Sequence, residues 1–256
     1  MQIVNQEAKI VNISHDNPLN AIEMAARNCY QSEINPDKTD GFIRGLIKRG
    51  HWSPMEHVTI TFELITDRGV LAEITRHRLA SYSVESTRYV NYKEGIDVIR
   101  PIGMETIFSN VIWEDAMADA EVAYIRMIEN NCSPQIARSV LPNSLKTKII
   151  MTINLRSLYN LFELRLASGA HPQIKDLAKK MLKETINLVP IIFDKFLEDK
   201  HKNINLYMGK KVICGACNEP MKYLPSLFWF RCDSCNRIIE PTAINGHMMR
   251  KDGYYV

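Results

Sequence analysis

Residues 58–64 show the pattern that most restricts what this chain can fold into. Apolar side chains stand at every second position from Val58 to Leu64, with polar side chains between them. A period of two predicts a β-strand with one buried face. The β-branched run at 148–154 predicts a second, buried strand.

Helical spacing marks the segments around these strands. Asn17 can cap a helix that begins at Pro18, and Gly50 should end the next one. Residues 81–100 are expected to be irregular or extended. Further helices are expected over residues 70–76, 113–130 and 156–167, and from Pro172 onward, where Pro190 should end or kink the last one.

Residues 76–89 carry the most unusual charge pattern. Arg76, His77 and Arg78 are followed by a run of hydroxyl side chains and then by Arg88 and Tyr89. The planar guanidinium group of arginine presents several N–H donors that suit phosphate oxygens, and hydroxyl groups complete such sites. The segment therefore predicts an anion site for phosphorylated ligands, and the alternative is a solvated basic surface. On an ideal helix the three cations would spread over about 200°, so they would serve different ligands or different subunits.

Composition sets the class of protein. The chain has 256 residues, enough for one large domain or one domain with a small module. The net charge of +3 is too weak to predict nucleic-acid binding. No apolar run approaches the roughly 20 residues that span a bilayer, and the N-terminus lacks a secretory pattern. A cytoplasmic protein without membrane or nucleic-acid partners is expected.

The cysteines near the C-terminus form two Cys-x-x-Cys pairs separated by fourteen residues. In a reducing compartment this spacing predicts a structural, four-thiolate zinc ribbon; another metal, such as iron, or loss of the metal is the alternative. The polar stretch 199–210 predicts a boundary between a domain at 1–205 and a zinc-ribbon module with a tail at 206–256. The expected zinc ligands are Cys214, Cys217, Cys232 and Cys235.

Four separated motifs resemble those of one enzyme family. Arg76-His77-Arg78 followed after seven residues by Ser86 is similar to the signature of flavin-dependent thymidylate synthases. The flanking segments 50–57, 137–142 and 154–160 agree with that family and stand in the expected order. The resemblance covers roughly residues 1 to 200, and the C-terminal cysteine module lies outside it.

The resemblance implies a fold and a reaction. The fold would be α+β, a mostly antiparallel sheet flanked by helices, and the protein a homotetramer with shared active sites. FAD would accept hydride from NADPH and relay the methylene group of methylenetetrahydrofolate to dUMP, which gives dTMP. Neither Cys29 nor Cys132 stands in a context that marks a nucleophile, so activation of the pyrimidine by cations is favoured.

The resemblance also assigns residues. Arg165 would lie by the uracil and promote ionisation at N3. The other substrate-binding positions would be Glu73, Arg76, Glu85, Ser86, Arg88 and Arg138. The flavin-contacting positions would be His51, Ser53, Arg76, His77, Arg78, Asn154, Arg156 and Asn160. Each has a plainer interpretation, since lone arginines are usually surface ion-pair partners and asparagines often cap helices.

One departure from the family pattern concerns the substrate. Many members have Asn-Glu or Ser-Gln where this chain has Ser83-Val84, and Val84 cannot make side-chain hydrogen bonds. Glu85 would compensate if its carboxylate reached the ligand. The change motivates a second hypothesis, a flavin enzyme that makes another C5 modification such as hydroxymethylation. A third is a nucleic-acid-binding protein on a degenerate enzyme core, which would bind no flavin.

Overall fold

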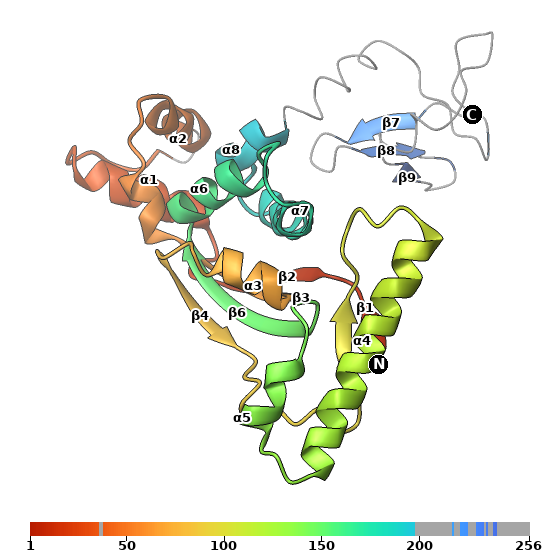
Figure 1. The fold of residues 1–256 in the computed structure, drawn as a ribbon. Coiled ribbons are helices and arrows are strands. Elements are labelled where there is room, and N and C mark those ends of the chain that lie inside the picture. Colours follow the sequence, from red (N-terminus) through yellow and green to blue (C-terminus); the bar gives the residue numbers. More distant parts are fainter. Residues whose placement is uncertain are drawn as a thin grey trace. The chain divides into compact units, whose positions relative to one another are not determined.

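The computed structural model describes residues 1–35 and 38–197, together with short stretches further on: 217, 221–224, 229–232, 234 and 238–239 (Figure 1). The chain divides into two compact units, Met1–Ile192 and Phe193–Val256. The predicted boundary between residues 205 and 206 lies outside the described residues. Among the helices that are described, none is long and apolar enough to cross a membrane.

A four-stranded antiparallel sheet forms the centre of the first unit, in the order β2-β3-β6-β4. Its longest pairing joins β3 to β6 from Thr59 opposite Asn154 to Asp67 opposite Lys146. This confirms the predicted α+β fold with a mostly antiparallel sheet. The four strands are β2 (Glu7–Ile13), β3 (Thr59–Asp67), β4 (Ala80–Val84) and β6 (Lys146–Asn154).

The apolar positions that alternate along the sequence are the buried positions of the sheet. Ile60, Phe62 and Leu64 on β3 are fully buried, while the residues between them are partly exposed. On β6, Ile149 and Met151 are fully buried as well. Burial of each such side chain contributes about 1.5–3 kcal/mol relative to exposure, so this face of the sheet fixes the register of the strands.

Helices α3, α6 and α7 pack against the sheet, and α7 contacts both β2 and α6. Asn17 caps α1, as predicted, because its side chain accepts a hydrogen bond from the Asn20 backbone N–H at 3.0 Å. The α-helices are α1 (Pro18–Asn28), α2 (Thr39–Lys48), α3 (Arg68–Ile74), α4 (Ile107–Glu129), α5 (Pro134–Ala137), α6 (Leu155–Arg165), α7 (Pro172–Ile186) and α8 (Pro190–Phe193). The short 3₁₀ helices are η2 (Ser53–His57), η3 (Arg138–Val140) and η4 (Asp194–Leu197).

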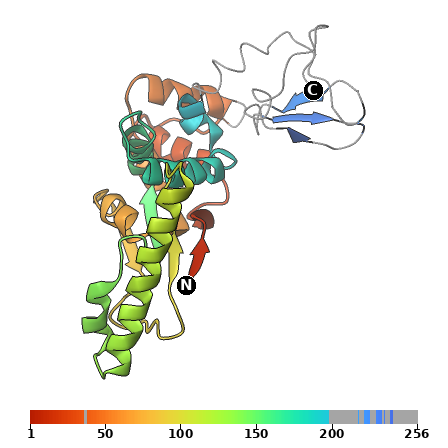
Figure 2. The ribbon, with the colours of Figure 1, turned by 45° about the vertical axis from the view of Figure 1, so that its right-hand side comes forward.

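The long helix α4 runs beside a second, two-stranded parallel sheet (Figure 2). Strands β1 (Gln2–Val4) and β5 (Asp97–Ile99) make this sheet. Trp113 and Met117 of α4 pack against a small core of Ile96, Val98 and Leu145. The helix begins earlier than expected because Thr106 caps it by accepting a hydrogen bond from a backbone N–H.

The Arg-His-Arg segment departs from the expected helix. Helix α3 ends at Ile74, so the three residues lie in the short link between α3 and β4. The Tyr82 hydroxyl donates to the carbonyl oxygens of Ile74 and His77, at 2.8 and 2.9 Å, and holds this link against the sheet. The chain turns at Thr75 and Arg76. His77 is buried, whereas Arg76 and Arg78 are exposed, so the three side chains do not share one environment.

The second unit contains a three-stranded antiparallel sheet in the order β7-β8-β9. Its strands are β7 (Met221–Leu224), β8 (Trp229–Cys232) and β9 (Ile238–Ile239). The predicted zinc ligands Cys214 and Cys235 lie outside the described residues, and Cys217 is exposed. The part of the chain that is described holds no group of three or more His, Cys, Asp or Glu side chains placed for a metal. The zinc site therefore stays a prediction.

Candidate functional site

The side chain of Arg165, at the end of α6, contacts the end of α3 and the link that follows it through three hydrogen bonds. Its Nη1 donates to the Glu73 carboxylate and its Nη2 to the Glu73 carbonyl oxygen, each at 3.0 Å. Its Nε donates to Nε2 of His77, also at 3.0 Å. The side chain is 20% exposed, so the guanidinium is partly buried but still reaches solvent.

His77 is an uncharged partner in this cluster. Its side chain is 8% exposed, and burial lowers its pKa to about 4, with the adjacent Arg165 charge acting in the same direction. A neutral imidazole has one nitrogen that accepts a hydrogen bond. His77 therefore accepts from Arg165 instead of repelling it as a second cation.

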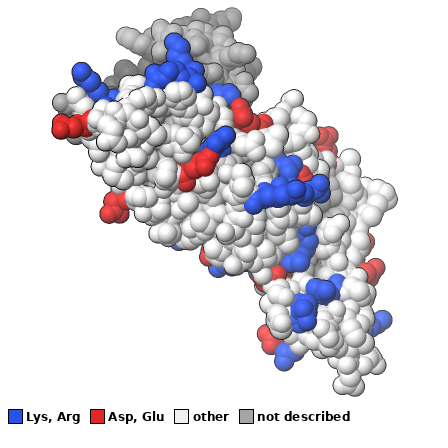
Figure 3. Space-filling model, turned by 90° about the vertical axis from the view of Figure 1, so that its left-hand side faces the viewer, with Lys and Arg blue, Asp and Glu red and all other residues white. Residues whose placement is uncertain are grey.

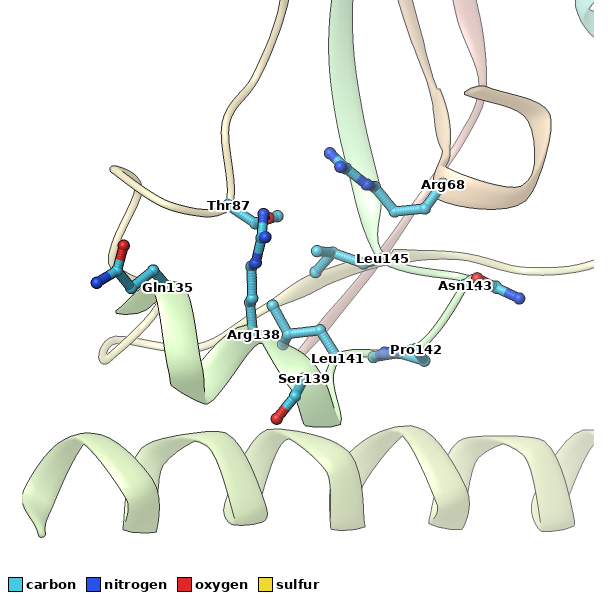
Figure 4. A pocket seen from close by; sticks show the side chains of 9 residues that line it. All are labelled: Arg68, Thr87, Gln135, Arg138, Ser139, Leu141, Pro142, Asn143 and Leu145. Atoms are coloured by element: carbon cyan, nitrogen blue, oxygen red, sulfur yellow. The ribbon is translucent and has the colours of Figure 1, made fainter. Parts of the chain in front are cut away.

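A cavity of about 420 Å³ lies at the other end of α3 (Figure 4). Arg68 enters it from the first residue of α3, and Arg138 from the junction of α5 and η3. Figure 4 shows their guanidinium groups directed toward the same region, with Thr87 beside Arg138. The described lining contains no acidic side chain. The lining residues are Arg68, Thr87, Gln135, Arg138, Ser139, Leu141, Pro142, Asn143 and Leu145.

Hydrogen bonds orient both arginines of the cavity. Arg138 Nη1 donates to the Thr87 hydroxyl at 3.3 Å. Arg68 Nη1 donates to the carbonyl oxygen of Glu85 at 3.1 Å and to the hydroxyl of Thr147 at 3.3 Å. None of these partners is a carboxylate, so the two positive charges are not neutralised by these contacts. The arrangement suits a phosphate group.

Arg68 stands outside every sequence motif and was not predicted as a site residue. Its position depends on Asp67, which caps α3 by accepting from the Val70 N–H, and on the segment before β6. The Arg68 backbone N–H lies 2.9 Å from the Asn143 carbonyl oxygen and 3.1 Å from that of Leu145. A positive side chain directly after a strand was the available signal, and it is a weak one.

Glu85 points its carboxylate at protein groups. Its Oε2 lies 3.2 Å from Lys146 Nζ, and its Oε1 accepts a hydrogen bond from the Tyr92 hydroxyl at 2.9 Å. Burial and this carboxylate both raise the pKa of Tyr92 above its ordinary value. Glu85 is absent from the cavity lining. In this structure the Glu85 carboxylate is therefore bonded to Lys146 and Tyr92, and its contact with the substrate stays a prediction.

The residues next to the cavity in sequence are more exposed. The Ser86 hydroxyl accepts from the Arg88 backbone N–H at 3.3 Å. The Arg88 guanidinium lies 5.6 Å from the centre of the Tyr89 ring, and Tyr89 is 80% exposed. This segment leads from β4 into the cavity at Thr87.

Comparison with known proteins places the chain in a family. Residues 11–191 match the family described as thymidylate synthase complementing protein. A flavin-dependent thymidylate synthase from Geobacter sulfurreducens is 33% identical over 197 residues, which cover 72% of this chain and 85% of that protein. The chain belongs to the flavin-dependent thymidylate synthase family.

Other relatives agree with this family. A flavin-dependent thymidylate synthase from Clostridium tetani is 30% identical over 228 residues, which cover 79% of this chain and 87% of the relative. Among solved structures, a UMP/dUMP methylase, PolB from Streptomyces cacaoi bound with 5-Br dUMP, matches with a TM-score of 0.66 and 26% identity. The match covers 77% of this chain and 97% of that one.

The positions matched to flavin contacts in this family lie on neighbouring segments. His51 and Ser53 are exposed and stand just before and within η2, which packs against α6. Arg156 on α6 is exposed and pairs with Glu56 of η2. Arg76 and Arg78 follow α3, whose end is bonded to α6 through Arg165. The fold therefore brings the three motifs around α6.

Two of these matched residues have simpler local surroundings. Asn154 caps α6, because its side chain accepts a hydrogen bond from the Ser157 backbone N–H at 2.8 Å. Asn160 is exposed on the same helix. The donor set around α6 still suits FAD, since exposed arginines and a serine hydroxyl match the phosphate oxygens of the cofactor.

Proposed function

We propose that this protein is an FAD-dependent thymidylate synthase that converts dUMP to dTMP, with methylenetetrahydrofolate as carbon donor and NADPH as reductant. One observation carries the proposal: Arg68 and Arg138 converge in a cavity whose described lining has no acidic side chain. A nucleoside monophosphate has a phosphate charge of about −1.5 to −2 at pH 7. Two guanidinium groups match that charge.

Hydroxyl groups complete the proposed phosphate site. Thr87 and Ser139 line the same cavity as the two arginines. Ser86 and Arg88 flank Thr87 in the sequence and would contact the sugar or the phosphate. Hydrogen bonds between charged partners contribute about 1.5–3 kcal/mol each, so this end of the nucleotide would supply much of the affinity.

Arg165 would act on the uracil ring. Opposite charge stabilises an anion in a partly buried site, so the guanidinium would favour the ring ionised at N3 and make C5 more nucleophilic. Its bonds to Glu73 and His77 use three of its five N–H groups. Within the described structure, the other two are left for a ligand.

The exposed residues around α6 would hold FAD. Ser53, Arg76, Arg78 and Arg156 would contact its polar groups, and His51 would lie near the flavin ring. When bound, FAD supplies the hydride transfer and the passage of the one-carbon unit, while the protein positions and polarises the nucleotide.

An oligomer with shared sites is part of the proposal, and α4 supports it. Ile107 is 86% exposed and Phe108 is 75% exposed, and Val111 and Ile112 extend the same apolar surface along the helix. Contiguous apolar surface of this kind marks an interaction site. We propose a homotetramer in which α4 is covered, and native mass spectrometry of the purified protein tests it.

A second candidate function is another C5 modification of a uridine nucleotide. Val84 is paired with Ile149 in the sheet, and the carboxylate of Glu85 is bonded to Lys146 and Tyr92 in this structure. The related methylase PolB is named for both UMP and dUMP. Hydroxymethylation of dUMP or methylation of UMP would each fit an altered contact here.

A third candidate, nucleic-acid binding on a degenerate core, has less support. The face shown in Figure 3 carries Lys and Arg in separate groups, with acidic side chains between them. This face therefore offers no continuous basic track for a phosphate backbone.

Product mass tests the function. The protein is incubated with FAD, NADPH, methylenetetrahydrofolate and either dUMP or UMP, and the nucleotide is analysed by mass spectrometry. The proposal expects dUMP to gain one CH₂ unit, with Arg165→Ala as the inactive control. Gain of CH₂O would support hydroxymethylation, and a preference for UMP would assign the ribonucleotide. An absence of flavin binding, together with salt-dependent oligonucleotide binding, would favour the third candidate.

A further inference from the structure

We propose that His77 is a positioning residue for Arg165, holding its guanidinium through a neutral ring whose proton is on Nδ1. This inference rests on the proposed function, because Arg165 receives its role there. It gives His77 a task different from the flavin contact that the sequence motif implies. The contact that carries it is the 3.0 Å hydrogen bond from Arg165 Nε to His77 Nε2.

The direction of this hydrogen bond fixes the tautomer. An arginine side chain donates hydrogen bonds and cannot accept them. His77 Nε2 must therefore be the acceptor and carry no proton, and the single proton of the neutral ring lies on Nδ1. An imidazolium would place a proton between the two nitrogen atoms and break the contact.

The backbone of His77 is fixed as firmly as its ring. The Tyr82 hydroxyl donates to the His77 carbonyl oxygen, and the ring itself is buried. Glu73, four residues earlier, supplies the other two contacts of Arg165. The guanidinium is therefore bound from two sides by groups on one short stretch of chain.

A guanidinium held in this way is oriented before the nucleotide arrives. A preorganised charge does not reorganise during the reaction, so it stabilises the transition state more than a mobile one. Loss of the His77 contact should therefore lower kcat more than it weakens dUMP binding. A residue needed only for flavin contact would instead change FAD affinity.

Three substitutions separate these roles. His77→Gln places a side-chain oxygen near the position of Nε2 and keeps the acceptor for Arg165. His77→Asn is shorter by one methylene and keeps a polar atom only near Nδ1. His77→Phe keeps the bulk and neither polar atom. His15→Gln, at an exposed histidine bonded to Ser14, is the matched control.

The first measurement is the turnover of dUMP. We expect kcat to fall at least tenfold in His77→Phe and His77→Asn, and His77→Gln to recover much of that loss. The Kd values for FAD and dUMP should change by less than about threefold, and thermal melting checks that each variant folds. Equal kcat in His77→Phe and the unsubstituted protein, or a loss confined to FAD affinity, would overturn the inference.

The second measurement does not depend on turnover. Nitrogen NMR of histidine-labelled protein at neutral pH should show His77 as the neutral tautomer with the proton on Nδ1. A proton on Nε2, or a charged ring, would overturn the assignment. Absence of turnover in the unsubstituted protein would refute the proposed function and this inference with it, whereas failure of the His77 results alone would refute only the inference.

Discussion

Nη1 of Arg165 lies 3.0 Å from the carboxylate of Glu73, although the two residues are 92 positions apart in the sequence. Helix α6 follows β6, and α3 follows β3, the strand beside it in the sheet. Because β3 and β6 are antiparallel, the two helices begin at opposite ends of this strand pair, and their C-terminal ends meet where Arg165 bonds to Glu73. The sheet therefore assembles the guanidinium and its partners.

Replacement of Arg165 by alanine should abolish turnover while FAD stays bound. Removal of a positioned charge that stabilises a developing anion typically costs a factor of 10² to 10³ in kcat. We expect at least a hundredfold loss, with the flavin spectrum of the variant unchanged. Arg49→Ala, at an exposed arginine at the end of α2, is the control and should turn over normally. Unchanged turnover in Arg165→Ala would refute the role given to this residue.

Substitutions of Glu73 should separate its charge from its hydrogen bond. Glu73→Ala leaves Arg165 Nη1 without its side-chain acceptor, and we expect kcat to fall about tenfold, which corresponds to roughly 1.4 kcal/mol. Glu73→Gln keeps an acceptor at the same place, so its kcat should fall less. Steady-state kinetics at saturating FAD measures both. An equal loss of kcat in the two variants would mean that the negative charge, and not the hydrogen bond, is what matters.

Local patterns predicted much of the fold. The alternation at 58–64 and the β-branched run at 148–154 became β3 and β6, which form the centre of the sheet. Both patterns report burial of the residue that carries them, so they can be recognised without knowing what lies opposite. Asn17 was identified as a cap for the same reason, because capping involves residues close in sequence.

The contacts of the site were harder to foresee, because they join distant segments. Arg68 became a candidate only when the fold brought Thr87 and Arg138 beside it. Glu85 was expected to face the ligand, and its pairing with Lys146 depends on the register of β4 against β6. The helix expected to run into Arg76 ends at Ile74, where the chain turns toward β4. A local period does not tell which residue of another strand a side chain will meet, or where a helix will give way to a turn.

The cysteine pairs of the C-terminal module give a prediction of their own. If four thiolates hold zinc, Cys214→Ser should lower the zinc content of the purified protein and make residues 206–256 more sensitive to proteolysis, because zinc binding supplies the folding energy of small modules. Elemental analysis and limited proteolysis measure these effects. Cys29→Ser, at an exposed cysteine of the first unit, is the control. Full zinc retention in Cys214→Ser would refute the four-thiolate site.

Arg68 and Arg138 should contribute to binding of the phosphate of dUMP and not to binding of its base. Arg68→Met and Arg138→Met should each weaken dUMP binding by about tenfold or more, because a hydrogen bond between charged groups is lost. Arg68→Lys keeps the positive charge, so its affinity for dUMP should fall less. Deoxyuridine, which has no phosphate, should bind all of these variants equally. Calorimetric titration with both ligands measures this, and an equal loss for deoxyuridine would show that the cavity does not hold the phosphate.

The stability of the protein should depend on the ionisation of His77 in mildly acidic solution. Its pKa is about 4 in the folded protein, against an ordinary value of 6.5, so between these values the unfolded chain binds the proton and the folded protein does not. Stability therefore falls as the pH drops from about 6.5 to about 4, by on the order of 2–3 kcal/mol. His77→Gln has no such group, so its stability should fall less over this range. Urea unfolding of both proteins at about pH 7 and about pH 4.5 measures the difference. Parallel losses in the two proteins would mean that other groups, and not His77, set the acid sensitivity.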